Sequence, residues 1–323
     1  MRSQLLMCKT VMVVLAVAVM LSAAAWADCG SIPFFSPIRA RDSISVVSEG
    51  LLAKPEVRLD PLEVVVYEPG QRAIILWNGR EEILLLSTEL RTAQAISVLE
   101  VVPLPAEPVV TLGEFETFEK MQDLVVRKTL WSVASGGGVA DVKAPKNAAR
   151  ITFHERMGAH DVAVVQVLDK RHFVQWVTTY LVGLGAENPQ VRPDFAQIIQ
   201  NYVDRGFEWF SFDVIETGDT VKSRQPIQYR FESPALYYPL EISTLEKGKT
   251  NINLLLVSPR PLGAFPEIRK ASLKRHEQFA ATPDEIRPIS EEWAAFMNGV
   301  PFVLQQVRIR GKLEHMTTDL LVR

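Results

Sequence analysis

Two histidines and two carboxylates lie close together in one segment, as His154, Glu155, His160 and Asp161. A turn centred on Met157-Gly158 would place Glu155 opposite His160, and His154 opposite Asp161, across a hairpin. Two imidazoles and two carboxylates are able to hold zinc, and a carboxylate beside a histidine raises its pKa. Strand alternation puts the two pairs on opposite faces, so one metal ion cannot easily use all four, and charge pairs on a wet hairpin are commoner. We therefore treat the four residues as a candidate binding site and assign no metal or cofactor.

Other catalytic signatures are missing from the sequence. It contains no G-x-S-x-G, H-E-x-x-H or C-x-x-C motif. The glycines of "SGGGVADVKAPKNAA" at 135–149 have neither the spacing of a Walker loop nor that of a dinucleotide fingerprint, and this favours a connector. The acidic doublets Glu81-Glu82 and Glu291-Glu292 are expected on solvated faces. The sequence therefore predicts no catalytic residue.

The first 27 residues have the pattern of a secretory signal. Arg2 and Lys9 precede an apolar stretch, and Ala25-Trp26-Ala27 supplies the small residues that signal peptidase requires. A retained membrane helix is the alternative, because about 16 apolar residues approach the roughly 17 to 25 that span a bilayer. We expect cleavage after Ala27 and no membrane span in the mature chain, which places the protein in the periplasm, the cell envelope or the extracellular space.

Cys29 is the one cysteine left after such cleavage, because Cys8 leaves with the signal. An intramolecular disulfide is then impossible. Asp28 precedes Cys29, whereas lipidation requires the cysteine to be the first mature residue. An unpaired thiol on a flexible terminus is expected, and an intermolecular disulfide stays open because exported proteins meet oxidising conditions.

Charge and length limit the partners and the architecture. Removing 1–27 leaves 33 Lys and Arg against 38 Asp and Glu, which argues against a nucleic-acid partner because phosphates need a basic field. The remaining 296 residues fit two modest domains. We predict a β-rich domain over 28–131, a linker over 132–149 and an α+β domain over 150–323.

The N-terminal part reads as an antiparallel β-meander with one covering helix. Turns at Pro69-Gly70 and at Asn78-Gly79, the latter of type I′, separate strands over 62–67, 72–77 and 81–87. A fourth strand is predicted over 95–102. Apolar residues at helical spacing in 113–128 predict a helix that covers this sheet.

The C-terminal part reads as two helices packed on an antiparallel sheet. One helix has an apolar face of Phe173, Trp176, Val177, Tyr180 and Leu181 and is capped by Asp169; the second lies between Pro193 and Gly206. Strands are predicted in "FEWFSFDVI", "PIQYRFES", "PLEIST" and "TNINLLLVS", followed by a long loop over 259–289. Short connections favour antiparallel pairing, so the predicted fold class is α+β.

Several segments in succession also carry a family resemblance. They are an early Cys-Gly, "QRAIILWNG", "VVPLPAEP", "HERMGAHDVAVVQVL", "YVDRGFEWFSFDV", "PIQYRF", "YPLEIS" and "VRIRGKLEHMTTDLLVR". In this order they resemble the domain of unknown function 2330 family of exported prokaryotic proteins. The resemblance implies no activity, so no catalytic residue can be carried over.

Two functional hypotheses follow from these observations. The first is a non-enzymatic exported module that binds another envelope protein or a surface polymer through sheet edges and loops. The second is a hydrolase or metal-assisted enzyme whose site has no motif. We favour the first, because an enzyme of this size usually shows a recognisable nucleophile, metal or cofactor motif.

Overall fold

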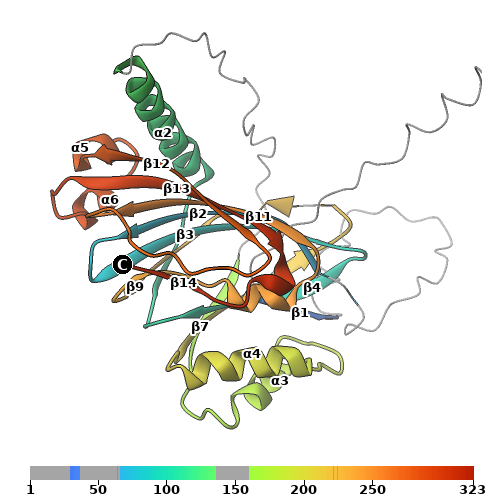
Figure 1. Ribbon diagram of the computed structural model, residues 1–323. Helices are drawn as coiled ribbons and strands as arrows, with labels where there is room; N and C mark the ends of the chain where they lie inside the picture. Colours follow the sequence, from blue (N-terminus) through green and yellow to red (C-terminus); the bar gives the residue numbers. More distant parts are fainter. Residues whose placement is uncertain (1–29, 37–63, 65, 136–159, 221, 224) are drawn as a thin grey trace, which may run out of the picture.

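Two β-sheets pack face to face, and helices cover parts of both outer surfaces (Figure 1). The computed structural model describes residues 30–36, 64, 66–135, 160–220, 222–223 and 225–323. The smaller sheet, sheet A, has the order β1-β4-β7-β6, with every neighbouring pair antiparallel. Its strands are β1 (Gly30–Phe34), β4 (Ile96–Leu104), β7 (Trp209–Thr217) and β6 (Asp161–Gln166).

The larger sheet, sheet B, has the order β12-β13-β11-β2-β3-β9-β5. One of its pairs, β11 with β2, is parallel, so the expectation of purely antiparallel pairing was wrong there. A small separate pair joins β10 (Leu236–Tyr238) to β14 (Leu320–Val322). The strands of sheet B are β12 (Ser272–Ala281), β13 (Phe302–Lys312), β11 (Lys249–Ser258), β2 (Val66–Trp77), β3 (Glu81–Thr92), β9 (Ile227–Glu232) and β5 (Val109–Leu112), and β8 (Lys222–Ser223) also pairs with β3.

Within the described residues, four apolar clusters hold these layers together. The first lies between the sheets and joins β4 to sheet B; the second packs α3 and α4 on sheet A; the third packs α2, α5 and α6 on sheet B; the fourth joins β4 and β7 of sheet A to β2 and β3 of sheet B. Figure 1 shows α3 and α4 on the opposite side of the molecule from α2. The helices are α2 (Phe115–Ser135), α3 (Phe173–Gly183), α4 (Pro193–Asp204), α5 (Pro283–Ile286) and α6 (Glu291–Phe296), with 3-10 turns η2 (Glu241–Leu245) and η3 (Leu313–His315).

The predicted α+β class is confirmed, and so is the helix that covers the N-terminal strands. Met121, Leu124 and Val125 of α2 are buried against β2 and β3. The predicted turn at Pro69-Gly70 is wrong, because β2 continues through it with a register shift between Tyr67 and Gly70. The hairpin at Gly79 exists but differs in type. Gly79 has φ of 101° and no other residue of this loop has a positive φ, which fits a type II′ turn with glycine at the first central position.

Three predictions in the C-terminal part need correction. The segment "PLEIST" forms η2 instead of a strand. The long loop over 259–289 contains the ten-residue strand β12 and the short helix α5. Asp169 does not cap α3, whose first flanking residue is His172; its carboxylate accepts hydrogen bonds from the Arg171 amide and the His172 ring instead.

Segments from both ends of the chain share each sheet. β4 pairs with β7, and β2 pairs with β11, although the predicted linker at 132–149 lies between the partners in the sequence. Strand pairing does not measure whether 28–131 and 150–323 unfold separately, so the division into domains stays a prediction. Among the described residues, no helix has the length and apolar character needed to cross a membrane.

Candidate functional site

His160 is the member of the predicted cluster that the structure places most clearly. Its Nδ1 lies 2.6 Å from Oδ2 of Asp213 on β7, and its Nε2 lies 2.9 Å from the carbonyl oxygen of Gln225. The side chains of His160 and Asp213 are only 9% and 3% exposed. Asp161 begins β6 opposite Val214, and His154 and Glu155 lie outside the described residues. The predicted pairing of His160 with Glu155 therefore stays a prediction.

The hydrogen bonds of His160 restrict its chemistry. A backbone carbonyl can only accept a hydrogen bond, so Nε2 must carry a proton. Nδ1 shares a second proton with the Asp213 carboxyl group. Both ring nitrogens are then engaged, whether the pair is imidazolium with carboxylate or neutral imidazole with carboxylic acid. A histidine held in this way has no nitrogen lone pair available for a general base or a metal ligand.

Asp213 belongs to a line of buried polar residues across sheet A. Ser31 of β1 lies opposite Glu100 of β4, and Glu100 lies opposite Asp213. The three residues are 2%, 5% and 2% exposed. Directly opposite residues point to the same face of a sheet, and we call these three residues the polar row.

A hydrogen-bonded group lies beyond each end of the polar row. At one end is His160, and at the other is Glu246, whose Oε1 accepts hydrogen bonds from the backbone amide and the hydroxyl of Ser31. Burial raises the pKa of Glu246 to about 7, although the Ser31 hydroxyl opposes that shift. The row thus links strand β1 to the C-terminal part of the chain through buried polar contacts.

The space beside the polar row is very small. A cavity of about 10 Å³ is lined by Glu100, His160, Tyr229 and four neighbours, which is roughly the room for one water molecule. Within the described part of the chain, no three His, Cys, Asp or Glu residues are arranged to hold a metal ion. The surroundings of His160 therefore have the character of a largely buried polar contact between the sheets.

Sequence reasoning missed Asp213, the partner of His160, and the neighbouring Glu100, because both lie on strands that are distant from His160 in the sequence. Asp213 and Glu100 each occur as a lone carboxylate within an apolar strand segment, "FSFDVI" and "SVLEVV". Buried charges are almost always paired, so such isolated carboxylates were the available signal. The same reasoning applies to Glu82, predicted on a solvated face. It is fully buried and accepts a hydrogen bond from the Tyr237 amide, and burial raises its pKa well above the usual range.

A second candidate region lies at the edge of sheet B, on β12. β12 pairs with β13 on one side only, and along the described chain no strand lies on its other side, which we call the open edge. Most of its side chains are exposed or half-buried. The register shifts between Arg275 and Gln278. A bulge and charged side chains are the usual means of protecting an edge from unselective pairing.

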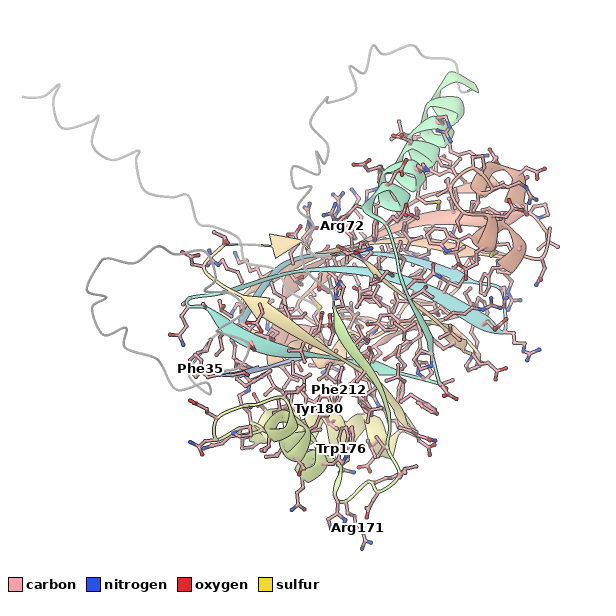
Figure 2. The ribbon with its side chains drawn as sticks, turned by 180° about the vertical axis from the view of Figure 1, so that it is seen from behind. Phe35, Arg72, Arg171, Trp176, Tyr180 and Phe212 are labelled. Carbon is pink, nitrogen blue, oxygen red and sulfur yellow. The ribbon has the colours of Figure 1, made fainter. Side chains whose placement is uncertain are left out.

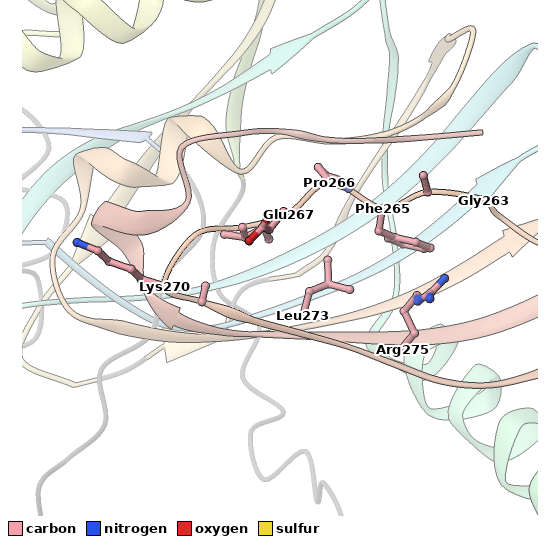
Figure 3. A pocket seen from close by; sticks show the side chains of 10 residues that line it. Gly263, Phe265, Pro266, Glu267, Lys270, Leu273 and Arg275 are labelled. Carbon is pink, nitrogen blue, oxygen red and sulfur yellow. The ribbon is translucent and has the colours of Figure 1, made fainter.

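A wide cavity adjoins this edge. It has a volume of about 530 Å³ and lies between the 263–271 segment and the start of β12 (Figure 3). Phe265 and Leu273 supply apolar surface, and the Arg275 guanidinium lies 5.2 Å from the centre of the Phe265 ring. Lys270 and Glu267 also line the cavity. In contrast to the space beside His160, this one is large enough to receive side chains of another molecule.

A stack of aromatic rings marks a third surface, between α3 and sheet A. Trp176, Tyr180 and Phe212 lie close together (Figure 2), with the Trp176 and Tyr180 ring centres 5.3 Å apart. Phe173 and Phe212 are buried, whereas Trp176 is 42% exposed. The predicted apolar face of α3 is therefore core at Phe173, Val177 and Leu181 and partly exposed at Trp176.

Together these features define an α+β protein of two packed sheets, with a largely buried polar contact inside and an open strand edge outside. The chain belongs to the family described as "Uncharacterized protein conserved in bacteria (DUF2330)", which residues 62–263 match. The resemblance identified from the sequence is thus confirmed.

The other comparisons add little. The crystal structure of baculovirus P35 aligns with 81% of this chain and 98% of its own, at 8% sequence identity and a TM-score of 0.44. A likeness at that level carries no argument about activity. No curated protein matches the chain.

Proposed function

We propose that the chain is an exported, non-enzymatic interaction module that binds a partner by adding a strand to the open edge of β12. The observation that carries the proposal is that edge itself. It is ten residues long, whereas β5, at the other end of sheet B, has four. Its unpaired amides and carbonyls are available to an extended segment of another chain, which is a recurring mode of recognition.

Export is part of this proposal, on the strength of the N-terminal signal pattern. Intact-mass measurement of secreted protein should give a chain that begins at Asp28 and carries no acyl group. Recovery of residues 1–27, or of a diacylglyceryl group on Cys29, would contradict it.

Site-specific crosslinking tests the binding role. A photoreactive residue at Gln278 on β12 should capture one reproducible partner from the native envelope, whereas the same residue at Gln197 on α4 should not. Both positions are exposed, so they differ in location more than in accessibility. Capture of the same products at both positions, or of none at Gln278, would count against the proposal.

A pair of proline substitutions separates the edge from the fold. Successive amides of a strand point to opposite sides, so of Leu273→Pro and Lys274→Pro one removes a bond to β13 and the other only blocks the open edge. The variant that keeps its bond to β13 and only blocks the open edge should keep the wild-type melting temperature and lose crosslinking from Gln278. If it keeps both, the partner does not use the edge.

The alternative hypothesis, a hydrolase or metal-assisted enzyme, gains no support from His160, because both ring nitrogens are engaged. We expect the purified protein to be inactive on peptidase, esterase, phosphatase and glycosidase substrates, with or without zinc. Turnover that is lost on His160→Ala or Glu155→Ala would favour the enzyme instead.

A further inference from the structure

The side chains of β12 carry a concentration of positive charge at the open edge. Lys274 and Arg275 are consecutive in the strand, and they are followed by His276 and by the carboxylate of Glu277. Alternation places Lys274 on the outer face of sheet B and Arg275 on the cavity side, where it lies over Phe265. Lys274 and Arg275 thus place positive charge on both faces of the edge in the first half of β12.

A second row of positive charge lies directly behind Lys274. Arg308 of β13 is opposite Lys274, and Arg310 is opposite Ser272. Like charges directly opposite each other in a sheet destabilise it, so the Lys274 and Arg308 pair is unfavourable in the chain alone. The pKa of His276 is lowered first by burial and then by Arg308 and Lys274, which is consistent with this local positive field.

Arg308 and Arg310 of β13 are fixed by hydrogen bonds to side chains that carry no negative charge. The Nε of Arg308 donates to Oδ1 of Asn253 at 3.0 Å, and the Nε of Arg310 donates to Oδ1 of Asn251 at 3.1 Å. Asparagine fixes a guanidinium but brings no negative charge. Elsewhere on sheet B arginines are paired with acids, as Arg230 is with Glu81. Within the described residues, the charges of Lys274, Arg308 and Arg310 are not balanced by a carboxylate in an ion pair.

The cavity side of the edge offers apolar surface as well. Leu273 and Phe265 face the cavity beside Arg275 (Figure 3). In a strand added to β12, side chains on one face would lie beside Lys274, and those on the other would lie beside Leu273 and Arg275. Complementarity to this edge therefore requires acidic groups together with at least one apolar side chain.

We propose that the open edge of β12 selects an extended acidic segment of a partner protein, with its carboxylates beside Lys274 and Arg275 and an apolar side chain in the Leu273–Phe265 cavity. This proposal rests on the proposed function and specifies the chemistry of its partner. A carboxylate beside Lys274 would relieve the repulsion between Lys274 and Arg308. The same charges disfavour neutral or basic strands, so the edge is protected from unselective pairing while it stays open to an acidic one.

Peptide binding to residues 28–323 tests the proposal. The acidic probe is a fluorescent peptide of five Glu-Val repeats between glycines, and the control peptide has Lys in place of Glu. Fluorescence anisotropy should show at least tenfold tighter binding of the acidic peptide, and binding should weaken as salt increases. Equal binding of the two peptides would overturn the charge selectivity and leave strand addition intact.

Charge reversal at the edge provides the matched test. Lys274→Glu should weaken binding of the acidic peptide at least tenfold and improve binding of the Lys peptide, whereas Arg171→Glu, at an exposed position beside α3 that does not line this cavity, should change both less. Lys274→Gln, with a smaller structural risk, should show an intermediate loss, and thermal melting checks that each variant is folded. Unchanged preference in folded Lys274→Glu would overturn the inference.

Two further outcomes separate this inference from the proposed function. If crosslinking from Gln278 captures a partner but no acidic peptide binds, the inference fails and the binding role stands. If inorganic polyphosphate binds and the peptide does not, the edge recognises a polymer and the inference fails again. If neither crosslinking nor peptide binding occurs at β12, both proposals fail.

Discussion

The charged groups beside sheet A and those at the open edge of sheet B differ in burial and in pairing. In sheet A, Asp213 and His160 are buried and hydrogen-bonded to each other, and Ser31 and Glu246 form a second buried contact. At the open edge of sheet B, Lys274 and Arg308 are in register with no acid between them. Buried charges must be satisfied within the chain, whereas exposed ones are free to serve an external partner. The open edge of β12 is therefore the region with charges left for a partner, although the sequence pointed first to His160.

The largest expected effect tests whether the buried contact is structural. Asp213→Ala should lower the free energy of unfolding by about 3–5 kcal/mol, because it leaves His160 buried without its partner. Asp169→Ala is the matched control, since Asp169 binds His172 at a similar distance of 2.8 Å but both side chains are more than half exposed. Its effect should be below about 1 kcal/mol. Urea unfolding measures both, and equal effects would remove the distinction between the two regions.

The next effect depends on pH. The pKa of Glu246 is about 7 in the folded chain and near 4.5 when unfolded, so its folded-state pKa is raised. Wild-type stability should therefore fall as pH rises from about 4.5 to 7. Glu246→Gln keeps an acceptor for Ser31 and removes the ionisation, so it should be more stable than wild type at pH 8 by up to about 3 kcal/mol, at about 1.4 kcal/mol per tenfold change in proton affinity.

At pH 4.5 the two proteins should be nearly equally stable, because Glu246 is then protonated in the folded state. Urea unfolding at both pH values measures the difference. Glu267→Gln, on an exposed side chain, should change stability little at either value. A parallel pH profile for wild type and Glu246→Gln would mean that the buried contact does not titrate.

A smaller effect is expected where β1 meets η2. A Cβ on Gly30 would lie 2.5 Å from Cγ1 of Ile242, so Gly30→Ala should destabilise the fold by about 1–3 kcal/mol. Gly183→Ala is the control, because nothing lies within 4 Å of its added Cβ. Thermal unfolding should separate them, and equal melting temperatures would show that β1 contributes little to sheet A.

The smallest effect belongs to the edge. Lys274→Ala should change the free energy of unfolding by less than about 0.5 kcal/mol in either direction, as is usual for exposed side chains. Removing the repulsion with Arg308 favours a slight gain. Differential scanning calorimetry checks this value, and a loss of several kcal/mol would show that Lys274 maintains the fold itself.

The local pattern of the sequence predicted the elements better than their pairing. The helical spacing of α3 and α4 and the strand in "PIQYRFES" are local signals, and the structure confirms them. The parallel pairing of β11 with β2 joins residues about 180 positions apart, and no local pattern specifies such a neighbour. β12 was missed for a similar reason, because an edge strand exposed on both faces lacks the apolar alternation that predicts strands.

In the candidate site, too, the residue type was predicted from the sequence and the long-range contact was not. His160 was identified by its chemistry, but its partner Asp213 depends on how β6 meets β7. The hairpin at Gly79 was predicted with Asn78 and Gly79 as its central residues, whereas the central residues are Gly79 and Arg80, and the positive φ falls on Gly79 alone. The basic edge could not be recognised in advance, because the register of β12 with β13 brings Lys274 and Arg308 together.

The shared sheets also constrain the order in which the chain can fold. β2 and β3 are synthesised early. β2 can pair on its second side only after β11 has been synthesised, and β11 can pair on its second side only after β13 has been synthesised. A chain delivered from its N-terminus would thus wait for roughly the last quarter of its length before sheet B is complete. Contacts of such long sequence separation form slowly. Sheet B is therefore expected to form late, after most of the chain has been synthesised.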